Sequence, residues 1–387
     1  MKYFTSFLLL FLSSHCFATH INISGYLKNF FIVQESLNND IFQLDTLYQS
    51  QNSARLMLDG FSDQMTWQIH YEPSIEFRSA ASPQFARKSN NYRLADIKNN
   101  ESNVNKTIVF HNLDRLNVQL QLKAGDLTIG RQAITFGSAR IINPSDVFLP
   151  FNFRVRNTEY RTGIDAIRFQ KPLGELSELD MGIVLSKDAK IENSAVFVQW
   201  LGNLSGNDIQ VTAMQFSKQK LLGLGYQGAL GAIGTWLEVA YVKGNADYYR
   251  LSLGFDYAFT ENTFFMLEYH NNGAGASNPS GYTDLQNDKA YQDGGVFLLG
   301  TNYLLSSLNW QISALLNLGF QGIVNLDDKS LFLNAALNYS LSENLYLGLA
   351  YYHFTGDDFL NALEGLQFGS EYGGNPNSIS IDLSFYF

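Results

Sequence analysis

The sequence of 387 residues is poor in several features of soluble domains. It has seven prolines, one cysteine and 16% charged residues, against 31 glycines. No run reaches the roughly 18 apolar residues that a transmembrane helix requires, which excludes a helical membrane protein. The length is compatible with two or three soluble domains or with one large β-architecture.

The first residues carry an export pattern. Lys2 precedes the apolar stretch 7–12, and Ala18 lies where a signal peptidase would cut. This arrangement predicts a secretory signal peptide over 1–18, because the stretch is too short to cross a bilayer as a helix.

The single cysteine leaves one alternative open at this end. Cys16 could be a lipoprotein attachment site, but His15 is bulky where such sites have a small residue. Cleavage after residue 18 would leave 19–387 as one domain without cysteine. The exported chain would therefore use no disulfide, although its compartment is oxidising.

Apolar and polar residues alternate almost everywhere after residue 20. Every second residue is apolar from Leu116 to Leu122, from Tyr249 to Phe259 and from Leu331 to Leu341. A helix would repeat its apolar residues at three and four, so these segments are predicted strands. The pattern indicates an all-β protein with about eighteen strands, and at least about sixteen.

The connections between these strands alternate in length. Short ones are expected at 62–64, 124–126, 306–308 and 341–343, and long ones at 35–50, 79–112, 137–162, 272–293 and 355–376. A soluble sandwich has no reason to place its long loops at one end, whereas an outer-membrane barrel has short periplasmic turns and long extracellular loops. We therefore expect a transmembrane antiparallel β-barrel with a polar lumen, a lipid-facing apolar surface and both termini in the periplasm.

The last strand ends on an aromatic residue. The apolar residues at every second position are Ile379, Ile381, Leu383, Phe385 and Phe387. Such a strand would close the barrel against 21–34, although an ordinary amphipathic edge strand has the same pattern. The stretch resembles the assembly signal of Gram-negative outer-membrane proteins. That resemblance implies recognition of Leu383, Phe385 and Phe387 by the outer-membrane insertase.

The most distinctive local stretch is 127–174. It resembles porin-like outer-membrane proteins and, more loosely, the alginate-export channels, through Gly130, Arg131, Gln132 and Gly137. In general porins the third external loop folds into the barrel. By analogy, 138–160 would be the constriction loop.

Basic residues are concentrated in this same region. Between 128 and 171 there are seven basic and three acidic residues, in a chain of net charge −10. Guanidinium groups in a confined pore attract anions. The candidate constriction and anion-binding residues are Arg131, Arg140, Arg154, Arg156, Arg161 and Arg168. The alternatives are a solvated outer loop, or pairing with Asp165 and Glu159.

Two other functions compete with a channel. An outer-membrane phospholipase or protease would need a histidine placed with a serine or an acidic residue, and His70 and His270 are predicted to be solvated residues of the pore wall. An adhesin or structural barrel would use its long loops as the functional surface. The GxGxxG at 223–228 precedes another strand rather than a helix, so it is not a nucleotide site.

The sequence therefore predicts a channel in the outer membrane of a Gram-negative bacterium. It would pass small hydrophilic solutes by diffusion, with some preference for anions such as acidic saccharides. The expected partners are outer-membrane lipid, lipopolysaccharide and the insertase, without nucleic acid, cofactor, metal or catalytic residues. The substrate and the oligomeric state are left open.

Overall fold

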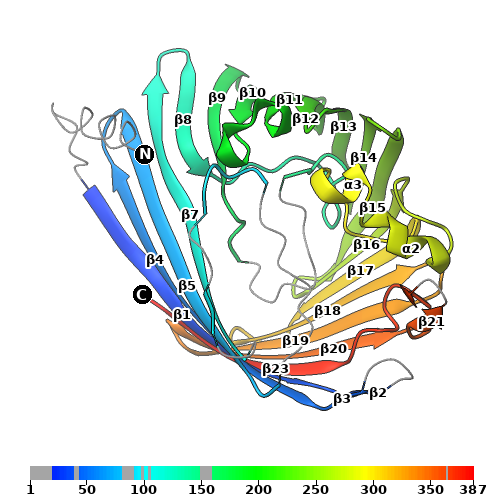
Figure 1. Ribbon diagram of the computed structural model, residues 1–387. Helices are drawn as coiled ribbons and strands as arrows, with labels where there is room; N and C mark the ends of the chain where they lie inside the picture. The colour runs from blue at the N-terminus through cyan, green and yellow to red at the C-terminus, as the bar shows by residue number, and fades with distance from the viewer. Residues whose placement is uncertain are drawn as a thin grey trace.

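The computed structural model describes residues 20–38, 43–80, 91–96, 100–102, 106–148, 159–362 and 365–387. Within them, eighteen antiparallel strands form a closed barrel, as predicted (Figure 1). The barrel strands are β1 (His20–Gln34), β4 (Leu47–Phe61), β5 (Met65–Arg78), β7 (Thr107–Leu122), β8 (Gly125–Gln132), β9 (Ile164–Gly174), β10 (Ser177–Val184), β11 (Ala195–Leu204), β12 (Asn207–Phe216), β13 (Gln219–Leu230), β14 (Ile233–Lys243), β15 (Tyr248–Thr260), β16 (Thr263–Asn272), β17 (Asn302–Gln311), β18 (Leu316–Asn325), β19 (Leu331–Ser342), β20 (Leu345–Thr355) and β23 (Ser378–Tyr386).

The remaining elements are short and lie in the connections. They are β2 (Leu37–Asn38), β3 (Gln43–Leu44), β6 (Asn100–Ser102), β21 (Leu360–Ala362), β22 (Gly365–Gln367), η1 (Lys187–Ala189), η2 (Ile191–Asn193), η3 (Pro279–Gly281), α2 (Tyr282–Leu285) and α3 (Lys289–Asp293). No helix among the described residues has the length and apolar character needed to cross a membrane.

The first and last strands close the barrel, as their sequences predict. β1 and β23 are antiparallel neighbours, with Tyr26 opposite Tyr386 and Val33 opposite Ile379. Gly25 and Phe387 exchange backbone hydrogen bonds of 2.9 and 3.1 Å at the end of this pair. Closure leaves neither strand with an unpaired edge, which a sheet surrounded by hydrocarbon requires.

Alternation along each strand separates two surfaces. On β15, Tyr249, Leu251, Leu253 and Phe255 point away from the barrel, and the polar residues between them point inward. The same holds on β23, where Phe385 and Phe387 are outward and 41% and 51% exposed. The barrel is thus apolar outside, whereas its inner face is mostly polar and carries apolar residues such as Phe197 and Phe216 where inner segments pack against it.

The connections also alternate as expected, with one correction. Two- to four-residue turns lie at the end that carries the termini. The long connections lie at the other end, together with the short ones at 217–218, 244–247 and 326–330. The strand expected directly after the connection 272–293 begins only at Asn302, as β17, and the turn expected at 306–308 lies at 312–315. Val296 and Leu298 are apolar because they are buried under neighbouring segments, not because they belong to a strand.

Candidate pore constriction

The connection after β8 runs inside the barrel. Residues 133–148 cross the interior and lie along the inner face of β11 to β16 (Figure 1, teal). Ile134, Phe136, Val147 and Phe148 are at most 5% exposed. The rings of Phe136 and Phe197 of β11 meet edge to face at 4.9 Å. Each such side chain contributes about 1.5–3 kcal/mol when buried, so this segment is held as firmly as a core element.

Two glycines of β13 allow this close approach. A Cβ atom at Gly223 would collide with Ser145, and one at Gly225 would collide with Ser138. These are the first two glycines of the GxGxxG stretch that resembles a nucleotide motif. Glycine is needed at these two positions because the loop lies directly against them.

Glu238 of β14 anchors the loop through its backbone. Its carboxylate is 1% exposed and accepts the N–H groups of Ser138, Ala139 and Ser145 at 2.8, 2.9 and 2.7 Å. Three backbone donors thus converge on the two oxygens of one carboxyl group. One wall residue therefore fixes both ends of the bend 138–145.

Glu268 of β16 forms a second anchor beside the first. It is fully buried and accepts the N–H groups of Ile141 and Ile142 at 3.1 and 2.8 Å. Trp236 Nε1 donates to the same carboxylate at 2.8 Å. The loop is thus held to the wall at two adjacent carboxylates.

A serine and a histidine lie close together beneath the loop. Ser252 Oγ is 2.8 Å from His270 Nδ1 and 2.6 Å from the carbonyl oxygen of Ile142. Both residues are at most 1% exposed, so the prediction of a solvated His270 is wrong. With the hydroxyl donating to the carbonyl, the pair holds the loop rather than activating a nucleophile.

Two predicted arginines project partly into the lumen. The Arg140 side chain is 44% exposed, pairs with Asp256 at 3.1 Å and lies 5.5 Å from the ring of Trp236. The Arg161 side chain is 41% exposed and pairs with Asp146 at 3.0 Å. Both guanidinium groups therefore keep a solvated side.

Arg131 has a different environment. It is 7% exposed and donates to both oxygens of Asp165 at 2.7 and 2.8 Å, and to Asp96 at 3.3 Å. The strand phase of β8 would point it to the outside, but Gly130 has a φ of 116°, a conformation that glycine adopts without strain, and the side chain lies inside. Pairing in the β8 ladder continues across Gly130 without a register shift. Arg131 thus ties segment 91–96 to the wall.

Arg168 is also paired rather than open. It binds Asp180 of β10 through three contacts of 2.6 to 3.1 Å, and its side chain is 21% exposed. Arg154 and Arg156 lie outside the described residues. The structure therefore brings Arg140 and Arg161 to the lumen and gives Arg131 and Arg168 acidic partners, as the pairing alternative predicted for Asp165.

The wall opposite the loop carries a second buried ionic network. Asp114 of β7 is fully buried, binds Arg55 at 2.5 Å and Arg115 at 3.0 Å, and accepts the N–H of Gly163 at 2.7 Å. The guanidinium of Arg55 lies 4.1 Å from the centre of the Tyr160 ring. Burial, with a further contribution from the nearby Glu159 carboxylate, raises the pKa of Tyr160, so its phenol stays neutral.

Glu159 connects this network to the barrel seam. Its carboxylate contacts Lys28 of β1 and accepts the hydroxyl of Tyr386 of β23 at 2.8 Å. Lys28 Nζ also lies 4.4 Å from the ring of Tyr26. The chain that returns from the loop therefore bridges the first and last strands from inside.

Sequence reasoning missed several of these residues. Two of them hold the loop and three form the ionic network on the opposite wall. None was predicted as a site residue from the sequence: Glu238, Glu268, Arg55, Asp114 and Arg115. Glu238 stands between Leu237 and Val239 in strand phase, so its inward direction was readable. The hydrogen-bond partners of Glu238 could not be predicted, because they are backbone groups of a loop that is distant in the sequence.

No protein family model matches the sequence, and no curated protein matches it. The fold matches solved bacterial porins. OccAB2 of Acinetobacter baumannii aligns at a TM-score of 0.59 and 10% identity, over 97% of this chain and 99% of the porin.

Two further porin structures have a similar fold. A BenF-like porin from Pseudomonas fluorescens Pf-5 aligns at 0.60 and 11% identity, over 96% of this chain and 100% of the porin. OccK2 of Pseudomonas aeruginosa in complex with glucuronate aligns at 0.58 and 11% identity, over 96% and 99%. The chain has the fold of these porins.

Proposed function

We propose that this protein is an outer-membrane channel of a Gram-negative bacterium, through which small hydrophilic solutes diffuse passively. The observation that carries the proposal is the segment 133–148, which is clamped against the inner wall of an eighteen-stranded barrel by Glu238 and Glu268. A barrel of this strand number encloses an aqueous channel, and a loop fixed within it narrows that channel.

The preferred solute is anionic, such as an acidic saccharide. Arg140 and Arg161 supply half-solvated positive charge in the lumen. Arg154 and Arg156 stay predictions for the same constriction. One porin of similar fold was solved with glucuronate, an acidic sugar, which supports this solute class.

The remaining expectations belong to the same proposal. Residues 1–18 would direct export, the outward apolar face would contact lipid and lipopolysaccharide, and Leu383, Phe385 and Phe387 would be read by the insertase. An enzymatic role is disfavoured, because the Ser252–His270 pair is buried and bound to the loop.

Recording of the purified protein in planar lipid bilayers tests the function. Discrete open steps whose reversal potential favours anions are the expected result. A folded barrel that gives no steps would instead favour the adhesin or structural role.

A further inference from the structure

Four tyrosine rings form a continuous row on the inner wall at the barrel seam. Tyr160, in the connection that leads to β9, has its ring centre 6.1 Å from that of Tyr26 of β1. Tyr26 lies 6.0 Å from Tyr386 of β23, and Tyr386 meets Tyr346 of β20 edge to face at 5.6 Å. The row therefore joins the connection before β9 to three neighbouring strands of the wall.

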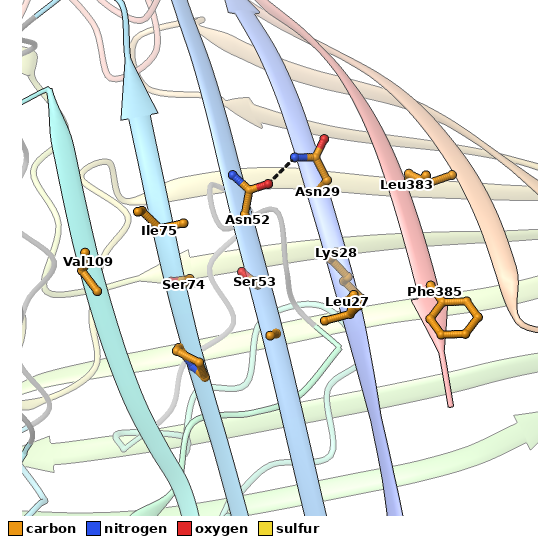
Figure 2. A pocket seen from close by; sticks show the side chains of 12 residues that line it. Leu27, Lys28, Asn29, Asn52, Ser53, Ser74, Ile75, Val109, Leu383 and Phe385 are labelled. Atoms are coloured by element: carbon orange, nitrogen blue, oxygen red, sulfur yellow. Dashed lines mark hydrogen bonds between the residues drawn. The ribbon is translucent and has the colours of Figure 1, made fainter.

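The alternation of the strands turns this row toward the lumen. Leu27 of β1 and Phe385 of β23 are opposite each other on the outer side of the seam (Figure 2). The tyrosines next to them in the sequence therefore point inward, because successive side chains of a strand face opposite sides. On β20, Leu347 is outward and exposed, which places Tyr346 on the inner face as well.

One end of the row is open to the lumen. Tyr26 is fully buried behind the other rings, whereas Tyr346 is 38% exposed. The hydroxyl of Tyr346 donates to the carbonyl oxygen of Glu343 at 3.1 Å, and its ring rests against Tyr386. Tyr346 is thus held in one orientation while part of its ring stays in contact with water.

The two ends of the row differ in charge. Arg161 follows Tyr160 directly, and its side chain is 41% exposed. Tyr346 lies beside the turn between β19 and β20, at the end of the barrel that carries the termini. The row therefore runs from positive charge at the candidate constriction to an uncharged aromatic surface near one mouth.

We propose that this tyrosine row, through Tyr160, Tyr386 and Tyr346, is a contact track for the pyranose ring of an acidic saccharide. The inference rests on the channel function proposed above and adds the residues that select a ring. The face of an aromatic ring is apolar and carries partial negative charge, so it attracts the C–H groups on one side of a sugar ring. The carboxylate of the same sugar pairs with Arg161 at the constriction. Each contact is weak, so the solute can enter and also leave, as conduction requires.

Blocking of the open-channel current in planar bilayers tests the track. Sodium glucuronate, an acidic pyranose, is compared with sodium gluconate, an open-chain sugar acid of the same charge. In the wild-type protein, blocking events should last longer with glucuronate than with gluconate. Tyr346→Ser should shorten the glucuronate events about two- to tenfold, the range expected for loss of one aromatic contact, and leave the gluconate events unchanged.

Two further variants separate ring contact from structural damage. Tyr346→Phe keeps the ring and should give glucuronate events of wild-type length. Tyr339→Ser removes an equally exposed tyrosine from the outer face of the neighbouring strand β19 and should have no effect. Heat-modifiable mobility shows whether each variant forms the barrel. If Tyr346→Ser does not, Tyr346→Leu, which keeps the apolar volume and lacks the ring, takes its place with the same expected result.

Three results would overturn the track while the channel function stands. They are equal event lengths for the two sugar acids in the wild-type protein, unchanged glucuronate events after loss of the Tyr346 ring, and equal shortening in Tyr339→Ser. A folded wild-type barrel without open steps would overturn the channel function and the track together.

Discussion

The backbone N–H of Ser145 donates a 2.7 Å hydrogen bond to Glu238, a residue of the barrel wall 93 positions further along the chain. The same carboxylate holds the N–H groups of Ser138 and Ala139. The bend of the inner loop is thus held by an acceptor on the wall, in addition to the hydrogen bond from Asp146 N–H to the carbonyl oxygen of Asn143 within the loop.

Replacing Glu238 with Gln should loosen the loop. The side-chain NH₂ of glutamine would face backbone N–H donors, and hydrogen bonds to a charged acceptor are each worth roughly 1.5–3 kcal/mol. We expect larger and noisier open-channel currents in planar bilayers. Glu261→Gln, in an exposed turn, is the matched control. Wild-type conductance in the Glu238 variant would show that the loop does not limit the pore.

Removing the two lumen arginines should change ion preference. Arg140→Gln with Arg161→Gln deletes two partly solvated positive charges and leaves Asp256 and Asp146 without these partners. The reversal potential in a salt gradient should move toward cations, most clearly in dilute salt, because screening acts over about 10 Å at 0.1 M.

The control for this change lies on an external loop. Lys187→Gln with Lys190→Gln removes the same charge from exposed positions after β10. If both double variants shift the reversal potential equally, total charge rather than the constriction sets selectivity.

Phe387 should matter for assembly more than for closure. Its backbone, not its ring, makes the hydrogen bonds to Gly25, so Phe387→Ala retains the closing pair while removing the outward aromatic residue. We expect less heat-modifiable protein in the outer-membrane fraction, and less again when the residue is deleted. Phe259→Ala removes another exposed aromatic residue and should have little effect. Normal amounts of Phe387→Ala would refute the assembly signal.

The orientation of the barrel can be read by labelling whole cells. A membrane-impermeant maleimide should react with Asp358→Cys in the long connection 356–377 and not with Asn344→Cys in the turn between β19 and β20. After lysis both should react. Labelling of the turn variant alone on intact cells would invert the predicted topology.

The fold was largely predictable from the sequence because alternation is a local property. The pairing of β1 with β23 could be predicted, because both segments are amphipathic and a barrel leaves no strand edge unpaired. The error at 294–301 has a physical cause. A segment packed inside the barrel is as apolar as a strand that faces lipid, and a residue such as Val296 looks the same in both environments.

The site was less predictable because charge spacing does not identify partners. Arg131 and Arg168 were predicted to be constriction residues, but each binds a carboxylate on a neighbouring strand, and only the register shows this pairing. Arg140 and Arg161, in the connection between β8 and β9, also have carboxylate partners, but their side chains stay 44% and 41% exposed. The carboxylates that hold the loop bind backbone atoms, which carry no sequence signal.

The bridge made by Glu159 sets an order of events in folding. Lys28 and Tyr386 come together only when strands from the two ends of the barrel meet, and this is among the most distant pairings in the chain. Glu159 can therefore bind both partners only when the first and last strands are paired. The bridge forms after closure, and opening the seam between β1 and β23 breaks it.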